Sequence, residues 1–209
     1  MQQIVFGDTA QSTSQVLEAA LDEFDGEHVT LRQLIGHMGE QGLLLLCTLL
    51  CLPFLFPVSI PGVSTVFGAG IILISLAIVT NRIPWLPGFV ADRQIATEKL
   101  KPTLERGVGA VKWLERFIRP RLHALTTGAV INRLNGLGIM LAGLLLMMPF
   151  GLVPFSNTLP AVAVLLFCAG IAQRDGLVVA GGYGMVIATI LYFAILAYLA
   201  FAAGQSVFA

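Results

Sequence analysis

Two clusters of small polar residues stand beside prolines in otherwise apolar sequence, and they are the candidates for chemistry. Their residues are Ser59, Ser64 and Thr65 in the first cluster, and Ser156, Asn157 and Thr158 in the second. Proline interrupts helical hydrogen bonding, and freed backbone groups at membrane depth are tolerated only where protein buries them or water reaches them. Hydroxyl and amide groups in such a place can replace the hydration shell of an ion or small solute. The two clusters are therefore predicted to line a substrate or ion pathway.

Charged residues follow the apolar runs that contain these clusters. Arg82 comes after the first run, and Arg174 and Asp175 come after the second. Ionisable residues embedded in a membrane are usually functional, whereas arginines at its edge are usually anchors. A gating or anion-contact role is therefore one interpretation of all three residues. The other interpretation is that the arginines anchor the chain at the interface and that Asp175 caps the final helix.

The sequence contains no motif of a known hydrolase, kinase or metalloenzyme. The patterns HExxH, GxSxG and the phosphate-binding loop are all absent. Cys47 and Cys51 are four residues apart and would share a helix face, which is compatible with a metal pair. No histidine or carboxylate lies close to them in the sequence, so these two and Cys168 are interpreted as small buried apolar residues. The chain is predicted to be no enzyme and to bind neither metal nor cofactor.

The composition predicts an integral membrane protein. Of the 209 residues, 56% are hydrophobic and 11% charged, whereas about a quarter of a soluble domain is charged. Ten of the twelve Lys and Arg lie between Arg82 and Arg133, and basic loops stay in the cytoplasm. Residues 81–134 and the N-terminus are therefore placed in the cytoplasm. The first apolar run follows an acidic lead, so no cleaved signal is expected.

An internal repeat sets the expected architecture. The segment from Pro61 aligns without a gap with the segment from Pro154, and Ile78 then pairs with Ile171. Each copy has a proline, a small polar cluster, a long apolar run and a polar pair containing arginine. Such duplication is typical of transporters built from two membrane elements of one plan.

The elements follow from the apolar runs, and the predicted fold class is an all-α integral membrane protein. Residues 1–42 are expected to form amphipathic helices at the interface, with Thr30 capping a short helix that runs towards Gly42. Two proline-broken hairpins, 43–80 and 135–175, flank the basic amphipathic helices of 81–134, and 176–209 is a transmembrane helix. The hairpin runs, the second from about Leu137, are short for a crossing of about 20 residues. They are either re-entrant or slightly short helices kinked by proline.

The final helix carries small residues at four-residue spacing. They are Ala180, Gly184 and Ala188. Such a stripe lets another helix approach closely, within the chain or from a second copy. A homodimer is predicted, because five apolar segments are few for a complete transport path.

The chain resembles the ExoD family of exopolysaccharide-synthesis membrane proteins from about Leu31 to Ala200. The resemblance is carried by the runs Pro61-Gly62-Val63-Ser64-Thr65, Asn81-Arg82-Ile83-Pro84-Trp85-Leu86-Pro87 and Pro154-Phe155-Ser156-Asn157-Thr158-Leu159-Pro160, and by Arg174-Asp175-Gly176. The family pattern often has Gly-Arg where this chain has Asn81-Arg82, so the arginine is retained. The resemblance implies a bacterial inner-membrane protein linked to exopolysaccharide production and alkaline tolerance, and it supplies no reaction.

Two functions from different classes fit these features. The first is a small transporter or channel-like protein for an ion or small polar solute, with the two proline turns at its site. The second is a non-transporting scaffold or accessory subunit of the exopolysaccharide machinery, docking through the basic helices. Expected partners are membrane lipid, a second copy and exopolysaccharide-synthesis proteins. Nucleic acid is not expected, because Glu98, Glu105 and Glu115 interrupt the basic segment.

Overall fold

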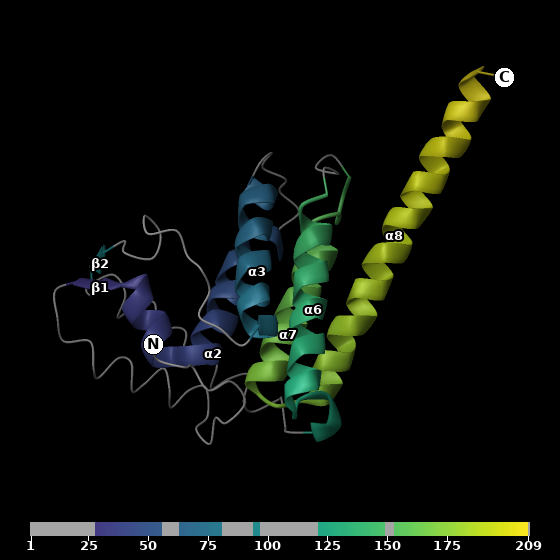
Figure 1. Cartoon of the computed structure of the whole chain (residues 1–209). Helices are drawn as coiled ribbons and strands as arrows, with labels where there is room; N and C mark the ends of the chain where they lie inside the picture. The colour runs from purple at the N-terminus through teal and green to yellow at the C-terminus, as the bar shows by residue number, and fades with distance from the viewer. Residues whose placement is uncertain (1–27, 56–62, 81–93, 97–120, 149–152, 209) are drawn as a thin grey trace.

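The protein is a helical bundle. The computed structural model describes residues 28–55, 63–80, 94–96, 121–148 and 153–208 (Figure 1). In chain order the elements are β1 (His28–Thr30), α2 (Leu31–Cys51), the 3₁₀ turn η1 (Leu52–Leu55), α3 (Val63–Thr80), β2 (Gln94–Ala96), the 3₁₀ turn η2 (His123–Leu125), α6 (Ala129–Leu146), α7 (Thr158–Ala172) and α8 (Gly176–Phe208). The predicted helical fold class is confirmed, and the short pair β1–β2 is added to it.

Two helical hairpins form the bundle. α2, continued by η1, packs against α3, and α6 packs against α7. The hairpins also pack on each other, α3 against α6 and α2 against α7, while α8 lies mainly on α7. One cavity, described below, lies beside four helix ends. The apolar part of α2 begins there and so does α6, and α3 and α7 end there. Both hairpins therefore run in the same direction, and both of their turns lie at the end of the bundle opposite this cavity.

Apolar residues spaced three or four apart build the core. On α3 the side chains of Ile71, Ile74 and Ile78 are at most 2% exposed, which is the spacing of one helix face. Leu73 and Leu76 on the outer face are apolar as well, yet exposed. A helix that is apolar all round is either deep in a core or in contact with lipid, and α3 is not enclosed by the described chain.

Phe167 of α7 is the most tightly enclosed aromatic residue of the described core. A methyl group at Gly138 of α6 would come within 2.6 Å of its Cζ, and one at Gly182 of α8 would lie 3.1 Å from its ring. The ring of Tyr183 meets it edge to face, with the centroids 4.7 Å apart. The two glycines therefore let α6 and α8 approach the ring from two sides.

The C-terminal half of α8 leaves the bundle. Figure 1 shows it diverging from α6 and α7 towards the C-terminus. The buried residues of α8 end at Thr189, and beyond it large apolar side chains such as Leu191, Ile195 and Phe201 are exposed. The stripe of Ala180, Gly184 and Ala188 also faces outward, so no helix of the described chain covers it.

The structure differs from the sequence-based expectation at three places. Gln94–Ala96 is a strand paired antiparallel with His28–Thr30, where helix was predicted. The helix that starts after Thr30 does not end near Gly42; it bends at Gly39 and continues to Cys51. α6 begins at Ala129, upstream of the predicted apolar run, because polar residues occupy its first turns. Most of the predicted basic helices, and the N-terminal helix before His28, lie outside the described residues.

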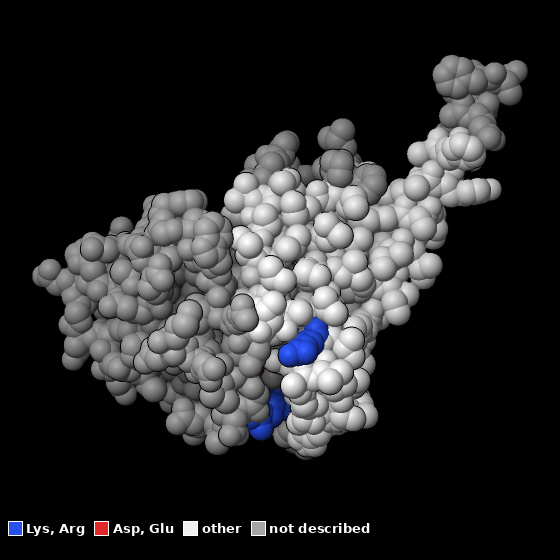
Figure 2. Space-filling model, viewed as in Figure 1, with Lys and Arg blue, Asp and Glu red and all other residues white. Residues whose placement is uncertain are grey.

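The charged side chains gather at the cavity end of the bundle. Among the residues described with side chains, the charged ones are Glu40, Arg121, Arg133, Arg174 and Asp175. In Figure 2 the visible basic side chains lie at the lower end, and the described surface above them carries no charge. The opposite end, where the hairpins turn, has no charged residue in the described part of the chain.

Candidate functional site

The proline-turn residues lie at the opposite end from the charged residues. Ser64 is half-buried and Thr65 exposed in the first turn of α3. Ser156 and Asn157 are buried directly before α7, and Thr158 is half-buried. Ser59 and Arg82 lie outside the described residues. Neither of the two cavities described below is lined by any of these polar-turn residues, so their predicted pathway role stays a prediction.

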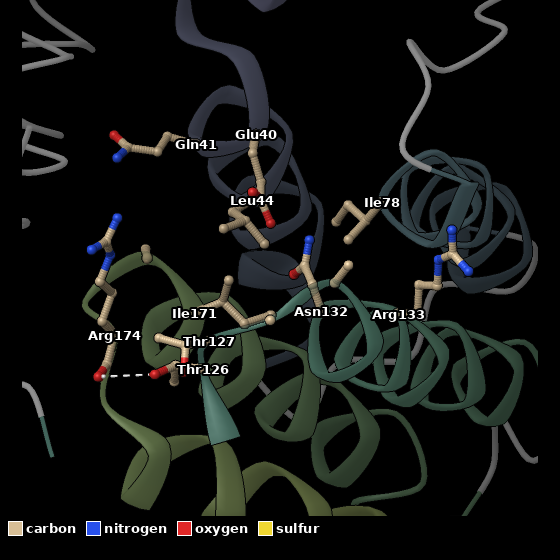
Figure 3. Close-up of a pocket in the computed structure, with 13 residues that line it drawn as sticks. Glu40, Gln41, Leu44, Ile78, Thr126, Thr127, Asn132, Arg133, Ile171 and Arg174 are labelled. Carbon is tan, nitrogen blue, oxygen red and sulfur yellow. Dashed lines mark hydrogen bonds between the residues drawn. The ribbon is translucent and has the colours of Figure 1, made fainter. Parts of the chain in front are cut away.

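A polar cavity of about 250 Å³ lies at the other end, where the four helices of the hairpins meet. Its floor is apolar and its rim carries amide, hydroxyl and charged groups (Figure 3). The lining residues named in that figure are Glu40, Gln41, Leu44, Ile78, Thr126, Thr127, Asn132, Arg133, Ile171 and Arg174. Of the predicted residues that the structure describes, Arg174 alone is part of this lining. We call this cavity the end pocket.

A bend in α2 brings two adjacent polar residues into the end pocket. Gly39 has φ 56° and ψ −133°, a conformation that is open to glycine and costly for other residues. Glu40 and Gln41 follow it directly, and both have a buried side-chain oxygen, Oε1. In Figure 3 the Glu40 carboxylate points into the middle of the pocket, and Gln41 and Arg174 point towards one another at one side.

Gln41 is the unusual member of the site. Its side chain is 4% exposed, and its Oε1 accepts no hydrogen bond within the described structure. A buried acceptor without a donor costs about 1–3 kcal/mol, so such groups are rare unless a ligand, ion or water serves them. The amide oxygen of Gln41, which in Figure 3 lies on the side of the amide away from Arg174, is therefore an unpaired acceptor of the described structure at one side of the pocket.

Arg174 is held in the pocket by the turn between α7 and α8. Its backbone has φ 52°, the left-handed conformation that glycine usually takes after a helix. The amide of Arg174 donates to Ile171 O at 3.2 Å, and the amide of Asp175 donates to Gly170 O at 2.8 Å. These two bonds form the Schellman arrangement, with arginine in the glycine position. Arginine at this position keeps a strained backbone, which is consistent with a functional role for its guanidinium group.

Asp175 has a structural role next to it. The carboxylate is 4% exposed, and its Oδ1 accepts a hydrogen bond from the Leu177 amide at 2.9 Å. This is the N-cap interaction of α8, as one of the two interpretations from the sequence predicted. Asp175 does not line the end pocket.

The start of α6 supplies backbone donors to the pocket. Gly128 is its N-cap with φ 101°, and no side chain caps the helix. The first N–H groups of a helix have no intrahelical acceptor and carry a partial positive charge. Thr127 Oγ1 donates to His123 O at 2.6 Å, which fixes the turn before the helix.

A second cavity, of about 430 Å³, lies between α6 and α8 and is almost entirely apolar. Its polar member, Asn135, is already satisfied. The Asn135 amide donates to Leu125 O at 2.9 Å, and the Tyr183 hydroxyl donates to Asn135 Oδ1 at 3.0 Å. These bonds tie α6, η2 and α8 together, which is a structural role.

The three cysteines cluster in the core. Cys47 and Cys51 of α2 and Cys168 of α7 are each at most 2% exposed, and the Cys47 and Cys168 thiols interact across the two helices. No group of three metal-binding side chains is found among the described residues. Burial in the apolar core agrees with the interpretation of these thiols as small apolar residues.

The arrangement as a whole defines a class of protein. It is a bundle of two helical hairpins with a polar pocket at one end, and two of its helices, Ala129–Leu146 and Gly176–Ala202, are long and apolar enough to cross a membrane. Residues 13–195 match the family described as "Exopolysaccharide synthesis, ExoD". The chain therefore belongs to the ExoD family, as the sequence runs around the prolines indicated.

Two relatives show how far the likeness extends. The chain is 61% identical over 202 residues to Protein ExoD of Rhizobium meliloti (strain 1021), which covers 97% of this chain and 84% of that protein. It is 27% identical over 183 residues to an uncharacterized protein of Synechocystis, covering 87% of this chain and 84% of that one. No solved structure matches this chain.

The sequence analysis missed most of the end pocket. In the sequence Glu40 belongs to the acidic lead before the first apolar run and Arg133 to the basic segment, and nothing singles out Gln41 or Asn132. One sequence pattern does indicate the pocket, because each hairpin begins with a polar segment directly before its apolar run. These segments are Glu40-Gln41-Gly42 in the first hairpin and Asn132-Arg133 in the second. Polar residues at helix starts meet when two hairpins pack in the same direction.

Proposed function

We propose that this protein is a membrane-embedded transporter-like protein of exopolysaccharide synthesis that binds a small polar solute in the end pocket. The observation that carries the proposal is Gln41, which lines a cavity together with Glu40, Asn132 and Arg174 and whose buried amide oxygen accepts no hydrogen bond within the described residues. An apolar floor with a small number of converging polar groups is typical of a ligand site.

The distribution of charge supports embedding in a bacterial inner membrane. The end pocket lies at the charged end, and the basic segment 81–134 connects the two hairpins. By the rule that basic loops remain inside, this end faces the cytoplasm and the proline turns face the other side. The exposed apolar residues of α8 then lie against lipid.

The proposed duplication supports movement between two states. Ile78 and Ile171, which the repeat alignment pairs, both line the end pocket. The two contacts between the hairpins, α2 with α7 and α3 with α6, are those that a two-fold relation along the bundle would generate. A pocket lined by both repeats opens or closes when one repeat moves against the other, which is how transporters of this type work.

Flux in proteoliposomes tests this proposal. Purified protein is assayed with protons, sodium, potassium, bicarbonate and glucuronate across an imposed gradient. Gln41→Leu and Arg174→Ala should lower the flux of the transported species at least tenfold, whereas Phe155→Gly, at the other end of the bundle, should not. Asn157→Ala tests the proline-turn cluster separately. Absence of flux for every species in folded protein would refute transport and leave the accessory-subunit function.

A further inference from the structure

We infer that the ligand of the end pocket is a small anion that also carries hydroxyl groups, in chemical terms a sugar acid or sugar phosphate. The inference rests on the proposed function, in that it names the ligand of the same pocket. It is argued from the charges, the acceptors and the size of the cavity.

The cationic groups of the end pocket outweigh the anionic one. Among the described residues that line it are Arg133, Arg174 and one carboxylate, Glu40, so the formal charge of this described lining is positive. The uncapped start of α6 at Gly128 and Ala129 adds the partial positive charge of a helix N-terminus. Backbone N–H groups and a guanidinium together are the usual donors to a carboxylate or phosphate.

The acceptors of the pocket need a ligand with hydrogen-bond donors. The buried Gln41 Oε1 has no donor in the described structure, and an anion without a hydroxyl group, such as chloride, would not satisfy it. The Glu40 carboxylate points to the middle of the same pocket and would repel a bare anion (Figure 3). A hydroxyl group on the ligand satisfies the Gln41 oxygen, because it donates a hydrogen bond.

The size and the floor of the pocket limit the ligand to a single small ring. A volume of about 250 Å³ corresponds to roughly eight water molecules at ~30 Å³ each. Leu44, Ile78 and Ile171 provide an apolar floor on which the carbon face of a sugar ring can lie. An inorganic ion would leave this floor unused.

Binding to purified protein in detergent, measured by isothermal titration calorimetry without any gradient, tests the inference. The probes are glucuronate, glucose 1-phosphate, glucose, inorganic phosphate and alanine. We expect saturable binding of glucuronate or glucose 1-phosphate, with glucose, phosphate and alanine at least tenfold weaker. Gln41→Leu and Arg174→Gly should each weaken that binding at least tenfold, and Phe155→Gly should leave it unchanged.

Each other outcome overturns the inference. Equal binding of glucose removes the anion requirement, and equal binding of phosphate removes the requirement for the hydroxyl groups of a sugar. Tighter binding of alanine identifies an ammonium ligand, and no binding by any probe removes the ligand class altogether. Binding without flux would refute the transport proposal alone, while flux that depends on Arg174 without binding of either sugar anion would refute this inference alone.

Discussion

Replacing Arg174 by glycine should separate the stability of the fold from the function of the end pocket. Arg174 occupies the left-handed position of a Schellman turn with φ 52°. A residue with a Cβ atom pays about 1–2 kcal/mol there, while glycine pays almost nothing. Glycine also has more conformational freedom in the unfolded chain, and this lowers its stabilising effect by about 0.5–1 kcal/mol.

The comparison that isolates the strain is Arg174→Gly against Arg174→Ala. Both variants lose the guanidinium and its contacts, but only alanine retains the strained backbone. The glycine variant should therefore be more stable by about 0.5–1 kcal/mol, and its Tm higher by about 1–4 °C for a chain of this size. Both variants should bind the sugar anions at least tenfold more weakly than the wild type.

Thermal unfolding followed by circular dichroism in detergent measures the first effect, and calorimetric titration measures the second. Phe155 offers a matched control, because it also has a left-handed backbone, φ 61°, and lies at the other end of the bundle. Phe155→Gly should exceed Phe155→Ala in stability by a similar amount, with binding unchanged. If Arg174→Gly is no more stable than Arg174→Ala, or if it binds normally, the argument that strain is retained for the guanidinium is refuted.

Two further predictions concern the packing around the site. Gly138→Ala should destabilise the protein by about 1–3 kcal/mol, because its methyl group would meet Phe167, whereas Gly184→Ala should be neutral or slightly stabilising, because a methyl group there meets nothing within 4 Å. Equal Tm values for the two variants would contradict this packing. Asp175→Ala should cost about 0.5–2 kcal/mol through loss of the bond to the Leu177 amide, with the solute affinity of the folded protein unchanged. A change in affinity would instead assign Asp175 a part in the site.

The sequence sufficed for the helices but not for the site. Long apolar runs bounded by prolines or polar residues predict α3, α7 and α8, because each stretch must satisfy its own backbone. The site depends on which helix ends meet, and that is decided by packing between the hairpins. Arg174 was found because it stands out against apolar neighbours, whereas Gln41 is uncharged and its burial without a hydrogen-bond donor is visible only in three dimensions.

Polar residues at the two ends of the bundle have different surroundings. The prolines of the sequence point to one end, whereas the end pocket lies at the other. At the proline turns, Ser156 and Asn157 are buried directly before α7, and neither lines one of the two cavities of the described structure. At the charged end, Gly39 bends α2 and the residues that follow it face the cavity instead of their own backbone. A polar residue becomes available to a ligand when the local backbone does not need it. Gln41 meets that condition, and this is the physical reason for placing the solute at the charged end.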